Sequence, residues 1–415
     1  MLTLTDAERA IAAGEEGEGA ATALRIVAES AQRLGAARLI PIASAHIDGC
    51  LYHGDSGTLF AEMLVARGAR TRVRATLNVG ALDLLRPNNV RLAGVPRAMA
   101  LRLMRAYEAL GCQPTWTCAP YQAGHRPAAG SDVAWGESNA VAFCNSVLGA
   151  RTNRYGDFLD IACAIVGRAP YYGLHQAENR RATLLVDATM LPAALRAEDA
   201  CWPVLGAWLG AVAGERVAVF DGLAAEATEE RLKALGAAAA AGGAVALFHV
   251  AGVTPEAPTV EAILAEGAER MALTPAMLRT ARACLSTATG DTINAVAIGS
   301  PHASEAEACA LARLLGGRRV RVPFYLNTGR GVLARLQQRG LLRGLADSGV
   351  VLIADTCIVA APILPEGGGV LLTNSAKFAH YAPGNTGYAV QYASLADCVE
   401  SAVAGRLVRD ESLWQ

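Results

Sequence analysis

The chain has 415 residues, and a single hydrophobic core rarely serves a chain of this length, so two or three domains are expected. Its composition is 53% hydrophobic and 18% charged, which excludes a disordered protein. The formal net charge of -1 provides no broad basic surface for phosphate contacts, so neither RNA nor DNA is an expected partner.

The beginning of the sequence and the cysteines bear on cellular location. Residues 1–10 lack a basic stretch followed by an apolar one, which argues against secretion. Ten cysteines without regular spacing are then typical of reduced thiols. We therefore expect a cytoplasmic protein.

Strands and helices are predicted to alternate along the chain, which indicates a parallel-rich α/β fold. The predicted strands are 38–42, 72–77, 184–186, 217–220, 245–250, 295–298, 318–322 and 350–354. The predicted helices include 21–34, 58–67, 96–110, 137–148, 229–239 and 305–315.

The segment 235–253 resembles a membrane span because it contains no Asp, Glu, Lys or Arg. It is rich in Ala and Gly, however, and Gly242-Gly243 divides it into a helix end and a strand. A membrane span needs a continuous apolar helix, so no membrane partner is expected.

Two breaks divide the chain into three predicted lobes. Helical periodicity stops at Pro170-Tyr171-Tyr172-Gly173, and a polar run closes at the turn Gly290-Asp291. We therefore predict an N-terminal lobe over 1–180, a second α/β lobe over 181–292 and a C-terminal α/β lobe over 293–415.

Three groups of residues carry chemical rather than packing side chains. They are Thr117 to Tyr121, Trp135 to Val141, and Asp355-Thr356-Cys357 with Thr373 to Lys377. Together with Asn145 to Asn153 and Gly173-Leu174-His175, these motifs resemble the large subunit of aconitase X. The resemblance extends over nearly the whole chain.

The resemblance implies a multi-lobed hydro-lyase of the aconitase superfamily that uses iron or an iron-sulfur cluster. It also implies a small hydroxy acid as substrate, either cis-3-hydroxy-L-proline or mevalonate 5-phosphate. Relatives need a small swivelling domain, fused or separate, which contributes a serine to the active site. We expect the chain to end before such a domain, so a small partner subunit is predicted.

The metal ligands are predicted from the motifs and from the chemistry of dehydration. An iron ion with an open coordination position helps a hydroxide to leave, and thiolates suit iron. Cys118 and Cys357 are the first two predicted ligands. At the third position Ser300 stands where phosphomevalonate-type relatives have a cysteine, and Cys50 is the candidate replacement, although a buried core thiol there is an equal alternative.

Glu137, Ser138 and Lys377 are predicted to bind substrate, and Glu137 and Lys377 to act in catalysis. Glu137 and Ser138 open a predicted helix, where backbone N–H groups favour an anion. Glu137 could hold a ring nitrogen or transfer a proton, or it could be a capping acid. Lys377 lies in the first turn of another helix, where its ammonium could pair with a carboxylate.

The remaining substrate positions come from the resemblance alone: Gly49, Cys50, Leu51, Asn78 and Val79 match positions that line the site in relatives. Glycine permits close backbone approach, and an asparagine offers both a donor and an acceptor.

Two classes of function remain open. The first is an iron-dependent dehydratase, and Ser300 favours cis-3-hydroxy-L-proline over mevalonate 5-phosphate as its substrate. The second is a non-catalytic iron-binding regulatory protein, which the absence of a basic surface disfavours.

Overall fold

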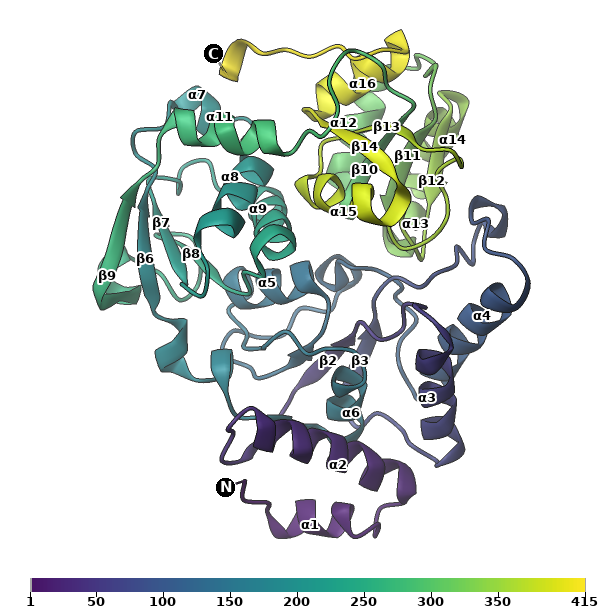
Figure 1. The fold of residues 1–415 in the computed structure, drawn as a ribbon, viewed down its shortest axis with the longest axis vertical. Coiled ribbons are helices and arrows are strands. Elements are labelled where there is room, and N and C mark those ends of the chain that lie inside the picture. The colour runs from purple at the N-terminus through teal and green to yellow at the C-terminus, as the bar shows by residue number, and fades with distance from the viewer. Residues whose placement is uncertain (1, 415) are drawn as a thin grey trace.

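Parallel sheets flanked by helices make up the protein (Figure 1). The computed structural model describes residues 2–414. In this part of the chain three sheets are wholly parallel, and a fourth is a short antiparallel pair, β1 (Leu39–Pro41) with β5 (Arg168–Pro170). The predicted α/β fold class is confirmed.

The first parallel sheet has the strand order β3-β2-β4. Its strands are β2 (Ser44–Ile47), β3 (Arg74–Leu77) and β4 (Ala134–Trp135). The helices around it are α1 (Asp6–Ala12), α2 (Glu18–Arg33), α3 (Asp55–Ala66), α4 (Gly94–Ala109), α5 (Ser138–Ser146) and α6 (Leu159–Val166).

The second parallel sheet has the order β8-β7-β6-β9. Its strands are β6 (Ala182–Asp187), β7 (Ala218–Asp221), β8 (Phe248–Val250) and β9 (Leu264–Ala272). Its helices are α7 (Ala193–Arg196), α8 (Cys201–Val212), α9 (Glu229–Gly243), α10 (Val260–Ile263) and α11 (Pro275–Cys284).

The segment that resembles a membrane span is a buried helix followed by a strand. Helix α9 ends at Gly243 and packs against α8 so closely that a Cβ on Gly206 would lie 2.1 Å from the carbonyl oxygen of Leu235. Small residues are therefore required by this contact between two helices. Within residues 2–414, no helix is both long enough and apolar enough to cross a bilayer.

The third parallel sheet has the order β12-β11-β10-β13-β14. Its strands are β10 (Ala295–Ala303), β11 (Phe324–Thr328), β12 (Val350–Ile353), β13 (Gly369–Thr373) and β14 (Tyr388–Tyr392). Its helices are α12 (Glu305–Leu315), α13 (Arg330–Gln338), α14 (Leu341–Asp347), α15 (Ala376–Thr386) and α16 (Leu395–Ala404). Each parallel sheet is built from strands of one predicted lobe, and the lobe boundaries themselves stay a prediction.

One predicted strand, 318–322, is wrong. The backbone N–H of Val320 donates to Ser348, whereas that of Arg321 donates to Ala402, so the segment bonds to two different neighbours instead of joining a ladder. The strand begins at Phe324, directly after Pro323. Six further strands were not predicted, because they are short, exposed or interrupted by polar residues and glycine: β2, β4, β5, β9, β13 and β14.

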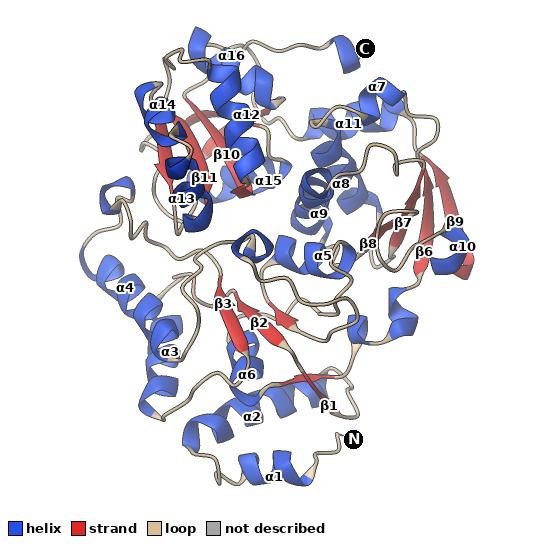
Figure 2. Cartoon of the chain, turned by 180° about the vertical axis from the view of Figure 1, so that it is seen from behind, coloured by secondary structure: helices blue, strands red, loops and turns tan. Residues whose placement is uncertain are grey.

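The carboxyl ends of the first and third sheets face one junction, which lies beside α5 (Figure 2). In the first sheet, Asp48 follows β2, Asn78 follows β3 and Gly136 follows β4. In the third sheet, the segments after β12 and β13 lead to Cys357 and Lys377. Because strands of a parallel sheet all end at the same edge, residues distant in sequence meet here.

A buried polar chain crosses the first sheet beneath this edge. His46 Nδ1 lies 2.9 Å from Thr76 Oγ1, which lies 2.7 Å from His125 Nδ1. Both imidazole rings also contact Trp135, at centroid separations of 5.6 and 4.9 Å. Burial lowers the pKa of His46 to about 4 and that of His125 to about 3, so both histidines are neutral in the folded protein.

These two histidines predict a loss of stability in acid. Because their pKa values are lower in the folded than in the unfolded chain, their contribution is complete above pH about 6.5 and is lost as the pH falls toward 4. Urea unfolding should show a loss of about 3 kcal/mol for each histidine over that range. His125→Gln should flatten this dependence, whereas His53→Gln, at an exposed position, should leave it unchanged. Equal slopes for wild type and His125→Gln would contradict the assignment.

Candidate active site

A buried ion pair joins the first and third sheets. Lys377, in the first turn of α15, donates from Nζ to Oε1 of Glu137. Only 10% of the Lys377 side chain and 6% of the Glu137 side chain are exposed. The carboxylate of Glu137 also caps α5, because Oε2 accepts from the backbone N–H of Ala140 at 2.7 Å. The capping and the functional interpretations of Glu137 are therefore compatible.

Both members of this pair are charged. Burial opposes the ionised form of Glu137, but Lys377 and the N–H donors of Ala140 and Asn139 outweigh it and hold the pKa of Glu137 below its ordinary value. Burial likewise opposes the charge on Lys377, and Glu137 raises the pKa of this ammonium. The pair fixes the ammonium group of Lys377 at the junction.

Cys118 and Cys357 both lie near the Lys377 ammonium, whose charge acts on each thiol. Burial raises the pKa of Cys118 to about 12 and also raises that of Cys357, and Lys377 opposes both shifts. The thiols lie close enough that the charge of Cys357 acts on the pKa of Cys118. Backbone N–H groups of Val359 and Ala360 favour a thiolate at Cys357. The structure thus brings together the two cysteines that the sequence singles out.

His302 connects the two segments that carry these cysteines. Its Nδ1 lies 2.9 Å from Thr117 Oγ1, and its Nε2 lies 3.1 Å from the carbonyl oxygen of Thr356. Its backbone N–H donates to Cys118 Sγ at 3.3 Å. Since a carbonyl can only accept, Nε2 carries the proton, and burial lowers the pKa of the ring to about 4. A neutral His302 therefore holds both cysteine loops.

Asp355 provides a second connection between the sheets. Its carboxylate pairs with Arg330, whose Nη2 lies 2.8 Å from Oδ2. The same oxygen accepts from the backbone N–H of Leu84 at 3.2 Å, and the carbonyl of Asp355 accepts from Gly80 at 2.7 Å. The loop after β3 is thereby tied to the residue that precedes the Thr356-Cys357 segment.

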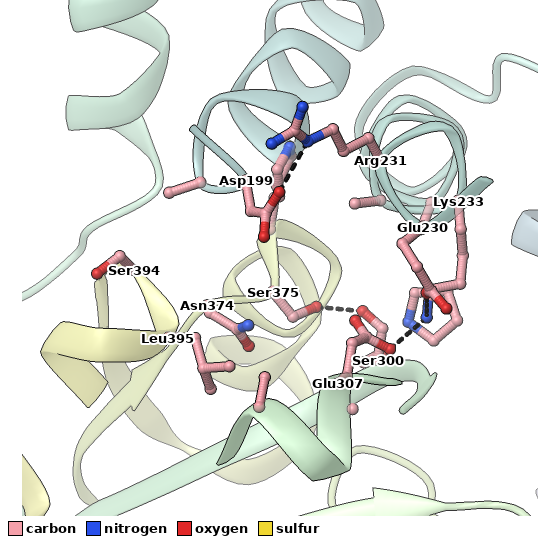
Figure 3. A pocket seen from close by; sticks show the side chains of 18 of the residues that line it. Asp199, Glu230, Arg231, Lys233, Ser300, Glu307, Asn374, Ser375, Ser394 and Leu395 are labelled. Atoms are coloured by element: carbon pink, nitrogen blue, oxygen red, sulfur yellow. Dashed lines mark hydrogen bonds and ion pairs between the residues drawn. The ribbon is translucent and has the colours of Figure 1, made fainter. Parts of the chain in front are cut away.

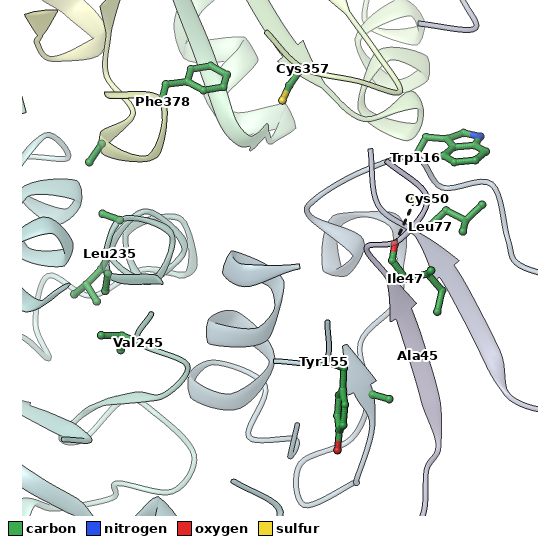
Figure 4. Packing of buried hydrophobic residues seen from close by; sticks show 14 of the residues in the cluster. Ala45, Ile47, Cys50, Leu77, Trp116, Tyr155, Leu235, Val245, Cys357 and Phe378 are labelled. Carbon is green, nitrogen blue, oxygen red and sulfur yellow. Dashed lines mark hydrogen bonds between the residues drawn. The ribbon is translucent and has the colours of Figure 1, made fainter. Parts of the chain in front are cut away.

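Cys50 has a different environment from the other two predicted ligands (Figure 4). It is completely buried, and its thiol lies 3.4 Å from the carbonyl oxygens of both Ile47 and Asn78 and 3.9 Å from that of Val79. Burial and neighbouring acids raise its pKa well above the ordinary value. A thiol that donates to backbone carbonyl groups carries its proton, which agrees with the alternative of a core cysteine. The metal role of Cys50 stays a prediction that this geometry does not support.

The donor set fits part of an iron centre. Two buried thiols near an ammonium and near backbone N–H groups suit thiolate ligands of iron or of an iron-sulfur cluster. In residues 2–414, however, no group of three His, Cys, Asp or Glu side chains could hold a metal ion. Cys118 and Cys357 would hold the group, and the described part of the chain brings no third His, Cys, Asp or Glu side chain to them.

Ser300, which stands at the third ligand position, borders a cavity of about 440 Å³ (Figure 3). Its carbonyl accepts from Ser375 Oγ, and the cavity reaches Lys377 from the side of α8 and α9. The cavity wall also carries Lys233, which pairs with Glu230 at 2.7 Å and with Glu307.

The other predicted substrate residues lie at the carboxyl edge of the first sheet. Gly49, Cys50 and Leu51 follow β2, Asn78 and Val79 follow β3, and Ser138 donates to Glu137 at 3.1 Å. Their contact with substrate stays a prediction.

Sequence reasoning missed two further residues, His302 and Asp48. Asp48 accepts from the side-chain amide of Asn78, and its own N–H donates to Asp160 at 2.6 Å. A polar residue directly after a predicted parallel strand is a usable signal, but β2 itself was not predicted.

Comparison with known proteins identifies the family. Sequence profiles of the aconitase X first, second and third domains match residues 1–178, 182–283 and 293–404. The chain belongs to the aconitase X family. It is a dehydratase, a hydro-lyase, of this family, as predicted.

Three relatives illustrate the similarity. The chain is 44% identical to a cis-3-hydroxy-L-proline dehydratase from Pseudomonas aeruginosa over 98% of this chain and 71% of that protein. It is 38% identical to the phosphomevalonate dehydratase large subunit of Methanothermobacter thermautotrophicus, over 91% of this chain and 93% of that one. The holo-form crystal structure of Thermococcus kodakaraensis aconitase X matches with a TM-score of 0.86 at 34% identity, covering 97% and 100% of the two chains.

The ion pair predicts non-additive effects of substitution. Lys377→Met should cost about 3–5 kcal/mol of unfolding free energy because it leaves a buried carboxylate unpaired. Adding Glu137→Gln should restore part of that stability but none of the dehydratase activity. Denaturant unfolding and turnover of Lys377→Met, Glu137→Gln and the double variant test this. Additive stability losses would show that the two groups do not interact.

His302 should act through the two cysteine segments. His302→Leu removes the ring contacts to Thr117 and Thr356 and should cost about 2 kcal/mol. It should also lower dehydratase activity at least tenfold, because both thiols lose their support. His380→Gln, at an exposed position of α15, is the matched control and should behave as wild type. Full activity of His302→Leu would refute this role.

Proposed function

We propose that the chain is the large catalytic subunit of an iron-dependent cis-3-hydroxy-L-proline dehydratase. The observation that carries this proposal is the 44% identity to a protein of that name over 98% of the chain. Ser300, in place of the cysteine of phosphomevalonate-type relatives, supports the same choice. Dehydration of mevalonate 5-phosphate is the alternative, because a phosphomevalonate dehydratase large subunit is 38% identical.

The reaction removes the C2 proton and the C3 hydroxyl of the substrate as water. The enamine that results tautomerises to a cyclic imine, so no oxidant or reductant is needed. When bound at Cys118 and Cys357, iron or an iron-sulfur cluster supplies a Lewis acid for the leaving hydroxyl.

Lys377 would bind the substrate carboxylate. An ammonium has three donors, and the Glu137 carboxylate occupies one of them. Glu137 would act by holding Lys377 in place, because a lowered pKa makes it a weak base. A group that accepts the C2 proton would come from the small swivelling-domain subunit, whose existence is supported by the name "large subunit" of the archaeal relative.

The test is anaerobic purification of the chain together with a small swivelling-domain protein encoded in the adjacent reading frame. The complex should contain iron and dehydrate cis-3-hydroxy-L-proline. Cys118→Ser and Cys357→Ser should each reduce bound iron and activity by at least tenfold, because thiolates are the ligands. Cys284→Ser, at an exposed thiol, should retain both.

Two results would reject the proposal. Turnover of mevalonate 5-phosphate without turnover of the hydroxyproline would select the alternative substrate. Normal iron content in the Cys118→Ser, Cys357→Ser double variant would refute the ligand assignment.

A further inference from the structure

The loops after β2 and β3 present hydrogen-bond acceptors rather than donors. The backbone N–H groups of Asp48 and Gly49 already donate to Asp160 Oδ2, at 2.6 and 3.2 Å. The N–H of Asn78 donates to Ile47 at 2.9 Å. Free backbone N–H groups are what makes a loop bind phosphate or carboxylate, and these are occupied. This edge of the sheet is therefore suited to a hydrogen-bond donor.

Glu137 is not free to receive that donor. Its Oε1 accepts from Lys377 and from Ser138, and its Oε2 accepts from Ala140 and from Asn139. Two carboxylate oxygens offer about four acceptor positions, so this carboxylate is saturated. A cationic group of the substrate must be bound by another residue.

Asp48 has a free carboxylate oxygen that can accept a hydrogen bond, which Glu137 lacks. Its Oδ1 accepts from Asn78 Nδ2, and within residues 2–414 no group donates to its Oδ2. Asp48 is half-buried, whereas Asn78 is 3% exposed and has an unpartnered side-chain oxygen. A Cβ on Gly136 would lie 2.8 Å from Asp48 Cβ, so Asp48 packs against the residue that precedes Glu137.

The charges around Asp48 favour a cation. Three charged residues act on its carboxylate: the acidic Glu137 and Asp157, and the basic Lys377. Lys377 is already paired with Glu137, so the Asp48 carboxylate has no cation of its own among these groups. A phosphate placed at Asp48 would meet net negative charge.

We propose that Asp48, held in place by Asn78, binds the ring ammonium of a cyclic amino acid substrate. This inference rests on the proposed function and specifies how the site distinguishes an imino acid from a phosphorylated hydroxy acid. In proline-like acids the carboxylate and the ammonium are attached to the same carbon. Lys377 would bind the first group and Asp48 the second.

The test compares two competitive inhibitors of the iron-loaded complex. L-Proline carries the ring ammonium, whereas (S)-tetrahydrofuran-2-carboxylate has an oxygen in its place. Wild type should bind L-proline at least tenfold more tightly, as expected for a charge-assisted hydrogen bond. In Asp48→Asn this preference should fall to about threefold or less, with iron content and melting temperature unchanged. Equal inhibition constants for wild type, or an unchanged preference in Asp48→Asn, would overturn the inference.

A control variant separates a contact from a general charge effect. Asp157→Asn removes a nearby but exposed carboxylate and should keep the wild-type preference for L-proline. If Asp48→Asn fails to fold, Asn78→Ala replaces it, because loss of the Nδ2 donor should also lower the preference. Loss of preference in Asp157→Asn together with its retention in the Asp48 or Asn78 variant would refute a direct contact.

Failure of this inference differs from failure of the proposed function. A wild type that dehydrates cis-3-hydroxy-L-proline but does not discriminate the two inhibitors retains the function and refutes Asp48. If hydroxyproline is not turned over, calorimetry of the same two ligands still tests whether Asp48 binds the ring ammonium. Binding of neither ligand would overturn the inference.

Discussion

The buried ion pair between Glu137 and Lys377 is the interaction on which the rest of the site depends. Removing either charge from water costs several kcal/mol, which a buried partner and further hydrogen bonds must offset. Glu137 also caps α5, so the pair orients the beginnings of α5 and α15 toward each other. The fold thereby maintains one ammonium next to two buried thiols, and its charge opposes the rise in their pKa values that burial causes.

The site belongs to no single sheet. The carboxyl edge of the first sheet supplies Asp48, Asn78 and Glu137, and that of the third sheet supplies Cys357 and Lys377. Ligand sites commonly lie at the carboxyl ends of parallel strands, and here two such edges share one site. His302 connects them, and so does Asp355, which accepts from the backbone N–H groups of Gly80 and Leu84, so polar contacts close to the chemistry set the relative position of the sheets.

Sequence alone was informative where a residue type is chemically distinctive. Cys118, Cys357, Glu137 and Lys377 were singled out from motifs, and the structure brings them together. The environment of Cys50 could not be predicted, because its thiol contacts carbonyl groups from two separate loops. His302 was missed for a similar reason, since its importance comes from contacts with residues more than 50 positions away. The misplaced strand 318–322 reflects a loop whose β-branched residues mimic a strand pattern.

The central claim is that Cys118 and Cys357 bind one iron centre next to Lys377. Its most direct test is a crystal structure of the anaerobically purified protein with anomalous scattering measured on both sides of the iron absorption edge. The account predicts an iron peak within bonding distance of both sulfur atoms. Iron bound elsewhere, or a peak that contacts neither Cys118 nor Cys357, would contradict it.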